Sequence, residues 1–180
     1  IKGLVNELKT ESAKIGAAEK KSAYIGGLFY YMKGGIYKTT GNYSAFDLTG
    51  VVNVMPDVNG IPYDTDLENL KKTNADYIFF DCMNYAAYKQ AFANDKSNLS
   101  SMPAVNQGKI YSTTFYKYYG TNWENQLINA FYIGSVVYPD HFTFSEQKAD
   151  QILKVFYGEK LKYSKLVSEQ PPCVKHLSDW

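Results

Sequence analysis

The sequence has few of the residues that build metal centres and covalent active sites. It contains two histidines and two cysteines, and no CxxC pair occurs, so a structural zinc site is not expected. No GxGxxG follows a predicted strand and no GxxxxGK[ST] occurs, so the phosphate loops of nucleotide enzymes are missing. With so few histidines, no Ser-His-Asp or Cys-His set stands out. These absences argue against an enzyme and predict no resident metal or cofactor.

Charge of one sign and long apolar runs are also lacking. The net charge is +1 and no long run of Lys and Arg occurs, which argues against a nucleic-acid partner. No apolar stretch approaches the ~20 residues that span a bilayer. The length of 180 residues suits one domain with a sizeable core. The two cysteines, Cys82 and Cys173, could form a disulfide in an oxidising compartment or remain two thiols, and the sequence leaves both open.

Tyrosine is the residue in excess, with 17 Tyr beside 10 Phe. Packing in the core and at interfaces is the ordinary explanation for so many aromatic rings. The alternative is that part of them lines a ligand cleft, where rigid amphipathic rings give contact area at low entropic cost.

Short apolar runs alternate with helical patterns along the chain. Strands are expected at 23–28, 51–54, 77–81 and 110–113, and helices at 1–21, 44–49, 65–72 and after 85, 121 and 143. Capping-box spacing marks three of the helix starts, at 65–68, 121–124 and 143–146. This alternation predicts an α/β fold in three layers, with helices on both faces of a mostly parallel sheet.

The carboxyl ends of the strands are the expected ligand edge of such a sheet. The segments that follow three of the strands, 28–43, 82–85 and 114–123, are all rich in tyrosine. Helix N-termini point to the same edge, so backbone N–H groups suited to anions gather there. The position of the tyrosines, more than their number, therefore favours a Tyr-lined cleft.

Several segments in order along the chain resemble one protein family. They are YIGG at 24–27, NADYIFFD at 74–81, MPAVNQGKIY at 102–111, YGTNWENQLINAFYIG at 119–134, YPDHF at 138–142 and KVFYG at 154–158. Together they are similar to the C-terminal lobe of the periplasmic binding proteins that serve ABC importers of iron siderophores, cobalamin and haem. The resemblance implies a Rossmann-like lobe that binds its ligand against a second lobe and docks on a membrane permease.

The resemblance also implies a division of the chain and a set of partners. Residues 1–21 would be the end of a long interlobe helix, 22–160 the C-terminal ligand-binding lobe, and 161–180 a C-terminal tail. The expected partners are an N-terminal lobe of the same protein, the permease and ATPase of the importer, and a small-molecule metal complex. The expected location is extracytoplasmic, in the periplasm or at the cell surface, with the protein lipid-anchored or secreted.

Ten residues at the strand ends are candidate ligand-binding residues. They are Tyr30, Tyr31, Lys33, Tyr37, Asn84, Tyr85, Tyr118, Tyr119, Asn122 and Trp123. Phenol oxygens can bond a ligand or a ferric ion, and Lys33 can pair with an anionic chelate. Two alternatives stay open: the tyrosines belong to surface loops, and Trp123 belongs to the core.

Two carboxylates are candidates for docking on the permease. The resemblance implies that acidic residues of each lobe meet arginine pockets there, and Glu68 and Glu124 lie in the first turns of predicted helices. Capping of those helices would explain both positions equally well.

The leading hypothesis is therefore capture of a metal complex of the ferric siderophore, haem or cobalamin type for ABC import. Tyr-rich loops suit ferric complexes, whereas Lys33 and the helix N-termini suit a molybdate or tungstate oxyanion, which is the first alternative. A Rossmann-like enzyme domain and a surface holder of haem or a metal cluster are the others.

Overall fold

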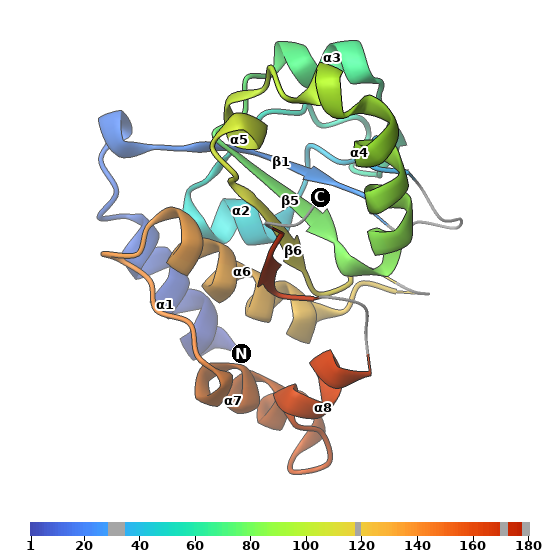
Figure 1. Cartoon of the computed structure of the whole chain (residues 1–180). Helices are drawn as coiled ribbons and strands as arrows, with labels where there is room; N and C mark the ends of the chain where they lie inside the picture. Colours follow the sequence, from blue (N-terminus) through green and yellow to red (C-terminus); the bar gives the residue numbers. More distant parts are fainter. Residues whose placement is uncertain (29–34, 118–119, 170–172, 178–180) are drawn as a thin grey trace.

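A computed structural model describes residues 1–28, 35–117, 120–169 and 173–177 (Figure 1). Its main sheet has the strand order β3-β1-β5-β6-β7. The strands are β1 (Ser22–Gly26), β3 (Val52–Asn53), β5 (Tyr77–Asp81), β6 (Ile110–Thr113) and β7 (Lys175–His176). All neighbours pair in parallel except β6 and β7, which confirms the predicted mostly parallel sheet.

Helices cover both faces of the sheet (Figure 1). One layer contains α1 (Lys2–Ser12), α2 (Ser44–Thr49), α6 (Trp123–Val137) and α7 (Glu146–Tyr157). The other contains α3 (Leu67–Lys72), α4 (Tyr85–Leu99) and α5 (Pro103–Asn106). The core divides accordingly, because Ile25 and Phe79 pack on the first layer and Tyr24, Ile78 and Phe80 on the second. The predicted three-layer α/β/α architecture is confirmed.

The alternation of side chains along β5 explains this division. Successive residues of a strand point to opposite faces, and β5 is buried from Ile78 to Asp81. Phe79 therefore contacts the rings of Phe46 and Tyr111 on one face, while Phe80 contacts Tyr88 and Phe92 on the other. A strand with two buried faces has the near-continuous apolar sequence from which β5 was predicted.

Helix starts differ from the three predicted capping boxes. The carboxylate of Asp66 caps α3 by accepting from Asn69 N at 2.8 Å, and Ser145 caps α7 by accepting from Lys148 N at 3.2 Å. Helix α6 has Asn122 as its N-cap, without a side-chain cap bond. Each cap lies one or two residues beyond the predicted threonine, and Asp, Asn and Ser outrank Thr at this position.

The ends of the chain depart further from prediction. Helix α1 ends at Ser12, and residues Ala17–Glu19 form a separate 3₁₀ turn, so a single helix over 1–21 was wrong. The Glu19 carboxylate accepts from Gly16 N at 2.9 Å, which holds that turn in place of a helix. A small antiparallel sheet of β2 (Lys38–Thr39) and β4 (Tyr63–Asp64) was also not predicted.

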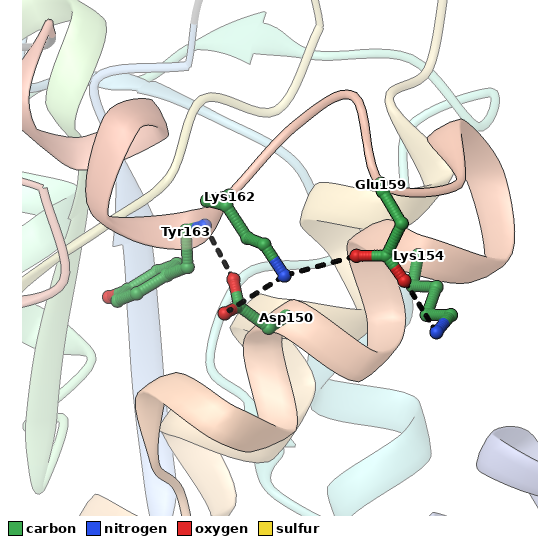
Figure 2. Close-up of polar contacts among 5 residues, drawn as sticks. All are labelled: Asp150, Lys154, Glu159, Lys162 and Tyr163. Atoms are coloured by element: carbon green, nitrogen blue, oxygen red, sulfur yellow. Dashed lines mark hydrogen bonds and ion pairs between the residues drawn. The ribbon is translucent and has the colours of Figure 1, made fainter.

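Residues 161–180, interpreted as a tail, contain α8 (Tyr163–Ser168) and β7. Figure 2 shows how polar contacts fix the turn between α7 and α8. Asp150 accepts from Tyr163 N at 2.7 Å. The Glu159 carboxylate lies between Lys154 and Lys162, and the hydrogen bond from Lys154 is the main cause that lowers the pKa of Glu159.

A disulfide joins the C-terminal segment to the sheet. Cys82, directly after β5, is bonded to Cys173, with their Cα atoms 5.1 Å apart, inside the range that disulfides require. Beyond it β7 extends the sheet and Leu177 is buried. The pairing that the sequence left open is therefore formed. None of the helices in the described segments is both long and apolar enough to cross a membrane.

Candidate functional site

The carboxyl edge of the sheet is formed where β1, β5 and β6 end, at Gly26, Asp81 and Thr113. The strand ends lie close together because the three strands pair in parallel. Gly26 allows this packing, since a Cβ there would lie 2.5 Å from both the Tyr24 ring and the Ile36 carbonyl oxygen. This edge is where the sequence predicted the ligand.

Asp81 joins the segments that follow β5 and β6 at this edge. Its side chain is fully buried, and its Oδ1 accepts from Met83 N at 2.9 Å while Oδ2 accepts from Tyr116 N at 2.8 Å. Both are charge-assisted bonds to backbone N–H groups, which are stronger than neutral ones. The loops that leave β5 and β6 therefore share one carboxylate.

Asn84 lies at the same exit, as predicted, and is buried. Its Nδ2 donates to the Gly27 carbonyl oxygen, which joins the β5 exit to the β1 exit. Its Oδ1 is buried and has no hydrogen-bond partner in the described chain.

Tyr85 opens α4 next to Asn84 and is half-buried. Its ring stacks on Tyr88, with centroids 5.8 Å apart, and Lys89 Nζ lies 6.0 Å from its centroid. Tyr88 is buried with an unpartnered hydroxyl, and burial raises its pKa. The pair offers an aromatic surface with a nearby cation.

The hydroxyl of Tyr37 already has a hydrogen-bond partner within the protein. It donates to Asp95 Oδ2 of α4 at 3.2 Å. Partial burial, followed by the nearby Asp95 carboxylate, raises the pKa of Tyr37 to about 12. A ferric ion binds tyrosine as the phenolate, so this environment disfavours Tyr37 as a metal ligand.

The first turn of α6 contributes Asn122 and Trp123. Trp123 is 60% exposed, so its assignment to the core is excluded, although Leu127 and Phe131 on the same helix are buried. Trp123 lines an apolar cavity of about 480 Å³ between α1, α2, α6 and α7. Gln126 lines the same cavity.

Buried side-chain atoms without hydrogen-bond partners gather at this edge. In the described part of the chain they are Asn84 Oδ1, Tyr88 OH, Asn122 Nδ2, Asn125 Oδ1 and Gln126 Nε2. Asn84 ends the 3₁₀ turn after β5 (Cys82–Asn84) and Tyr88 lies in the first turn of α4. The other three lie at the N-cap and in the first turn of α6, the helix that follows β6. Buried polar groups are nearly always paired, and an unpaired one costs about 1–3 kcal/mol. The edge therefore offers donors and acceptors that the described chain leaves unused.

Asn125 and Gln126 were missed by the sequence analysis. Both are buried, although they lie in a segment interpreted only as a helix with an apolar face. The available signal was the group of amides Asn125, Gln126 and Asn129 in a helix that is buried nearly all round.

The two candidate docking carboxylates differ in environment. The Glu68 side chain is 87% exposed and has one long contact, 3.8 Å to Lys72. Glu124 accepts a hydrogen bond from Tyr157 OH of α7 at 2.8 Å. Burial, followed by this bond, raises the pKa of Tyr157 to about 12. Neither glutamate caps its helix, so capping does not explain either position.

Tyr30, Tyr31, Lys33, Tyr118 and Tyr119 lie outside the described residues, and their role stays a prediction. Within the described residues, no group of three or more His, Cys, Asp or Glu side chains is placed to hold a metal ion.

A sequence model of the periplasmic binding proteins matches residues 3–116 of the chain. The chain belongs to this family. A comparison with curated proteins finds no match.

Solved structures of solute-binding proteins share the fold. An ABC transporter solute-binding protein from Sulfurospirillum deleyianum has a TM-score of 0.67 at 20% identity, over 92% of this chain and 52% of its own. The molybdate-binding protein MolA of Haemophilus influenzae has a TM-score of 0.63 at 15% identity, over 88% and 48%. The periplasmic haem-binding protein HutB of Vibrio cholerae has 0.55 at 16%, over 74% and 53%. The chain thus spans about half the length of the periplasmic binding proteins that it matches.

Proposed function

We propose that this chain is a ligand-binding lobe of the solute-binding component of an ABC importer. It captures a metal complex, with a ferric complex of the siderophore type first and haem or cobalamin next, and delivers it to a permease and ATPase. The observation that carries this proposal is the set of unpartnered buried amide and hydroxyl groups at the carboxyl edge of the sheet. Ligands of open parallel sheets bind at this edge.

The chemistry of the edge favours an intact complex over a bare ion. The side chains present are amides, a hydroxyl and aromatic rings, which recognise the organic shell of a chelate. The exposed Trp123 ring beside an apolar cavity suits a planar or aromatic chelator. The raised pKa of Tyr37 also favours an intact complex, because Tyr37 would have to lose its hydroxyl proton to coordinate a bare ferric ion.

The rest of the proposed assembly follows from the family. Since the matched structures are about twice as long as this chain, we propose that a second, N-terminal lobe closes over the edge. An extracytoplasmic location is supported by the Cys82–Cys173 disulfide, because disulfides persist in oxidising compartments. Anchoring by lipid or secretion completes this part of the proposal.

An oxyanion is the second candidate ligand. Asn122 Nδ2 and Gln126 Nε2 are unpartnered donors at the start of α6, whose first N–H groups carry partial positive charge. Unpartnered donors suit an oxyanion such as molybdate or tungstate, and the fold is shared with the molybdate-binding protein MolA.

Trp123 provides the test of ligand class. The sequence has two tryptophans, so Trp180→Phe leaves Trp123 as the only one. We expect the iron(III) complex of 2,3-dihydroxybenzoate to quench its fluorescence saturably, and haemin, nickel–histidine and molybdate to compete weakly. Saturable competition by molybdate would favour the oxyanion candidate, and no saturable signal from any of the four would contradict the proposed function.

Gln126→Leu, made in the Trp180→Phe background, tests whether the α6 amides contact the ligand. It removes an unpartnered buried donor and also the acceptor of Ser44 Oγ at 3.3 Å, so stability should change by no more than about 1 kcal/mol. Affinity for the ferric complex should fall roughly tenfold, the equivalent of one polar contact. Unchanged affinity would show that the α6 amides do not contact the ligand.

Glu68 is the better candidate for docking on the permease, because its carboxylate is exposed and weakly paired. Glu68→Lys should reduce ligand uptake by cells at least roughly tenfold while leaving the affinity for the ferric complex unchanged, since reversed charge at an interface costs several kcal/mol. Glu169→Lys, also at an exposed carboxylate, should leave uptake intact. Equal losses in both variants would argue against a specific contact at Glu68.

A further inference from the structure

The turn that follows β5 is fastened to three different segments by nearly consecutive residues. Asp81 accepts from Tyr116 N in the loop after β6. Cys82 is bonded to Cys173 of the C-terminal segment, and Asn84 donates to Gly27 O after β1. The turn is thus the point at which all three strand exits are joined.

We propose that Asp81 is a positioning residue for the ligand site, an inference that rests on the proposed function. Asp81 itself is fully buried and needs no contact with the ligand. It fixes the loop after β6 against the turn after β5. The unpartnered groups of Asn84 and Tyr88 follow the turn after β5, and those of α6 follow the loop after β6. Because Asp81 joins this turn to this loop, it sets the spacing between the two sets of groups.

The burial of a carboxylate here calls for an explanation beyond packing. An ionised carboxylate is costly to bury unless hydrogen bonds compensate it, and the flanking β5 positions are apolar. The two backbone N–H groups at 2.8 and 2.9 Å compensate Asp81 and come from different loops. A neutral side chain would pack in the same space but could not accept both bonds with equal strength.

The same strand supplies a matched control at its other end. Asp76 immediately precedes β5, and its Oδ2 accepts from Ser22 N and Ser22 Oγ, both at 2.8 Å. It therefore joins β5 to β1 at the amino edge, away from the proposed ligand site. Asp76→Asn and Asp81→Asn make the same substitution at opposite ends of one strand. Both bonds of Asp76 go to one oxygen, which an amide retains, whereas Asp81 uses both of its oxygens and loses one acceptor.

Hydrogen–deuterium exchange of the whole chain tests the proposal without ligand. Asp81→Asn should speed exchange of Met83 and Tyr116 amides roughly tenfold, because an amide NH₂ replaces one accepting oxygen. Exchange in α7 should stay unchanged. Asp76→Asn should speed exchange near Ser22 and leave Met83 and Tyr116 as in the wild type. Unchanged exchange at Tyr116 in Asp81→Asn, or equal acceleration there in both variants, would overturn the positioning role.

Binding of the iron(III)–dihydroxybenzoate complex gives the functional readout. Asp81→Asn should weaken it roughly tenfold, and Asp76→Asn should leave it within about twofold. If Asp81→Asn loosens the loop but binds as the wild type does, the positioning role is overturned. If the wild-type chain binds none of the test ligands, the proposed function fails, whereas the exchange experiment still decides whether Asp81 holds the loops.

Discussion

Replacement of both Cys82 and Cys173 by serine should lower the free energy of unfolding by about 2–5 kcal/mol. The disulfide joins residues separated by 91 positions, and a long closed loop removes much of the entropy of the unfolded chain. At this chain length, such a loss should lower Tm by roughly 4–20 °C. Thermal unfolding followed by circular dichroism under non-reducing conditions measures the difference.

Two controls separate the cross-link from the loss of packing. Wild-type protein unfolded and refolded in reductant should have the Tm of the double variant, whereas reductant should leave the double variant unchanged. The folded wild type should resist reduction, because Cys82 and Cys173 are 1% and 3% exposed. A double variant as stable as the oxidised wild type would show that β7 and the buried Leu177 hold the C-terminal segment by themselves.

The strands β1, β3, β5 and β6 were predictable from sequence, whereas β2, β4 and β7 were not. β3 has only two residues, but it lies in the apolar segment 51–54. β5 and β6 begin and end where the sequence predicted, because each is buried between neighbouring strands and its composition reflects that environment. β2, β4 and β7 have two residues each, too few to form a pattern. β7 also depends on the disulfide, whose pairing cannot be derived from spacing.

The location of the site followed from topology, but its chemistry required the structure. A parallel sheet places its strand ends at one edge, and Asn84, Asn122 and Trp123 were predicted there for that reason. The partner of Tyr37 is 58 positions away in the sequence, beyond any local pattern. Likewise, Asn125 and Gln126 are candidates because each has one amide atom without a hydrogen-bond partner. Whether such an atom finds a partner depends on neighbours from other elements, which the local sequence does not reveal.

The sequence offered two explanations for the abundance of tyrosine, and the described residues support the first of them, packing in the core. Tyr24, Tyr43 and Tyr88 are almost fully buried and belong to the packing that the ordinary explanation predicted. Tyr85 is half-buried after the carboxyl end of β5, where its role in ligand binding stays a prediction. Composition alone could not separate the buried tyrosines from the half-buried one, because the burial of each ring depends on where it packs against the sheet.

Asn129→Ala should destabilise the protein by about 3–5 kcal/mol, chiefly through groups left unpaired in the core. Asn129 is fully buried, and its Oδ1 accepts from Thr114 N at 2.9 Å and Thr114 Oγ1 at 2.7 Å. Its Nδ2 donates to Thr114 O at 3.1 Å and to Tyr43 OH at 3.2 Å. Burial raises the pKa of Tyr43, so its hydroxyl stays neutral and needs this partner. Urea unfolding gives the free-energy difference.

Asn125→Ala is the matched control, one helical turn earlier on α6. Asn125 donates one bond, to Phe115 O at 3.2 Å, and its Oδ1 is unpartnered, so its removal should cost only about 1 kcal/mol. Asn129 uses its whole amide and anchors Thr114 after β6, whereas Asn125 has an unpartnered acceptor at the edge where we propose that the ligand binds. Asn125→Ala should therefore weaken binding of the ferric complex more than it lowers stability, and equal stability losses in the two variants would contradict this division of roles.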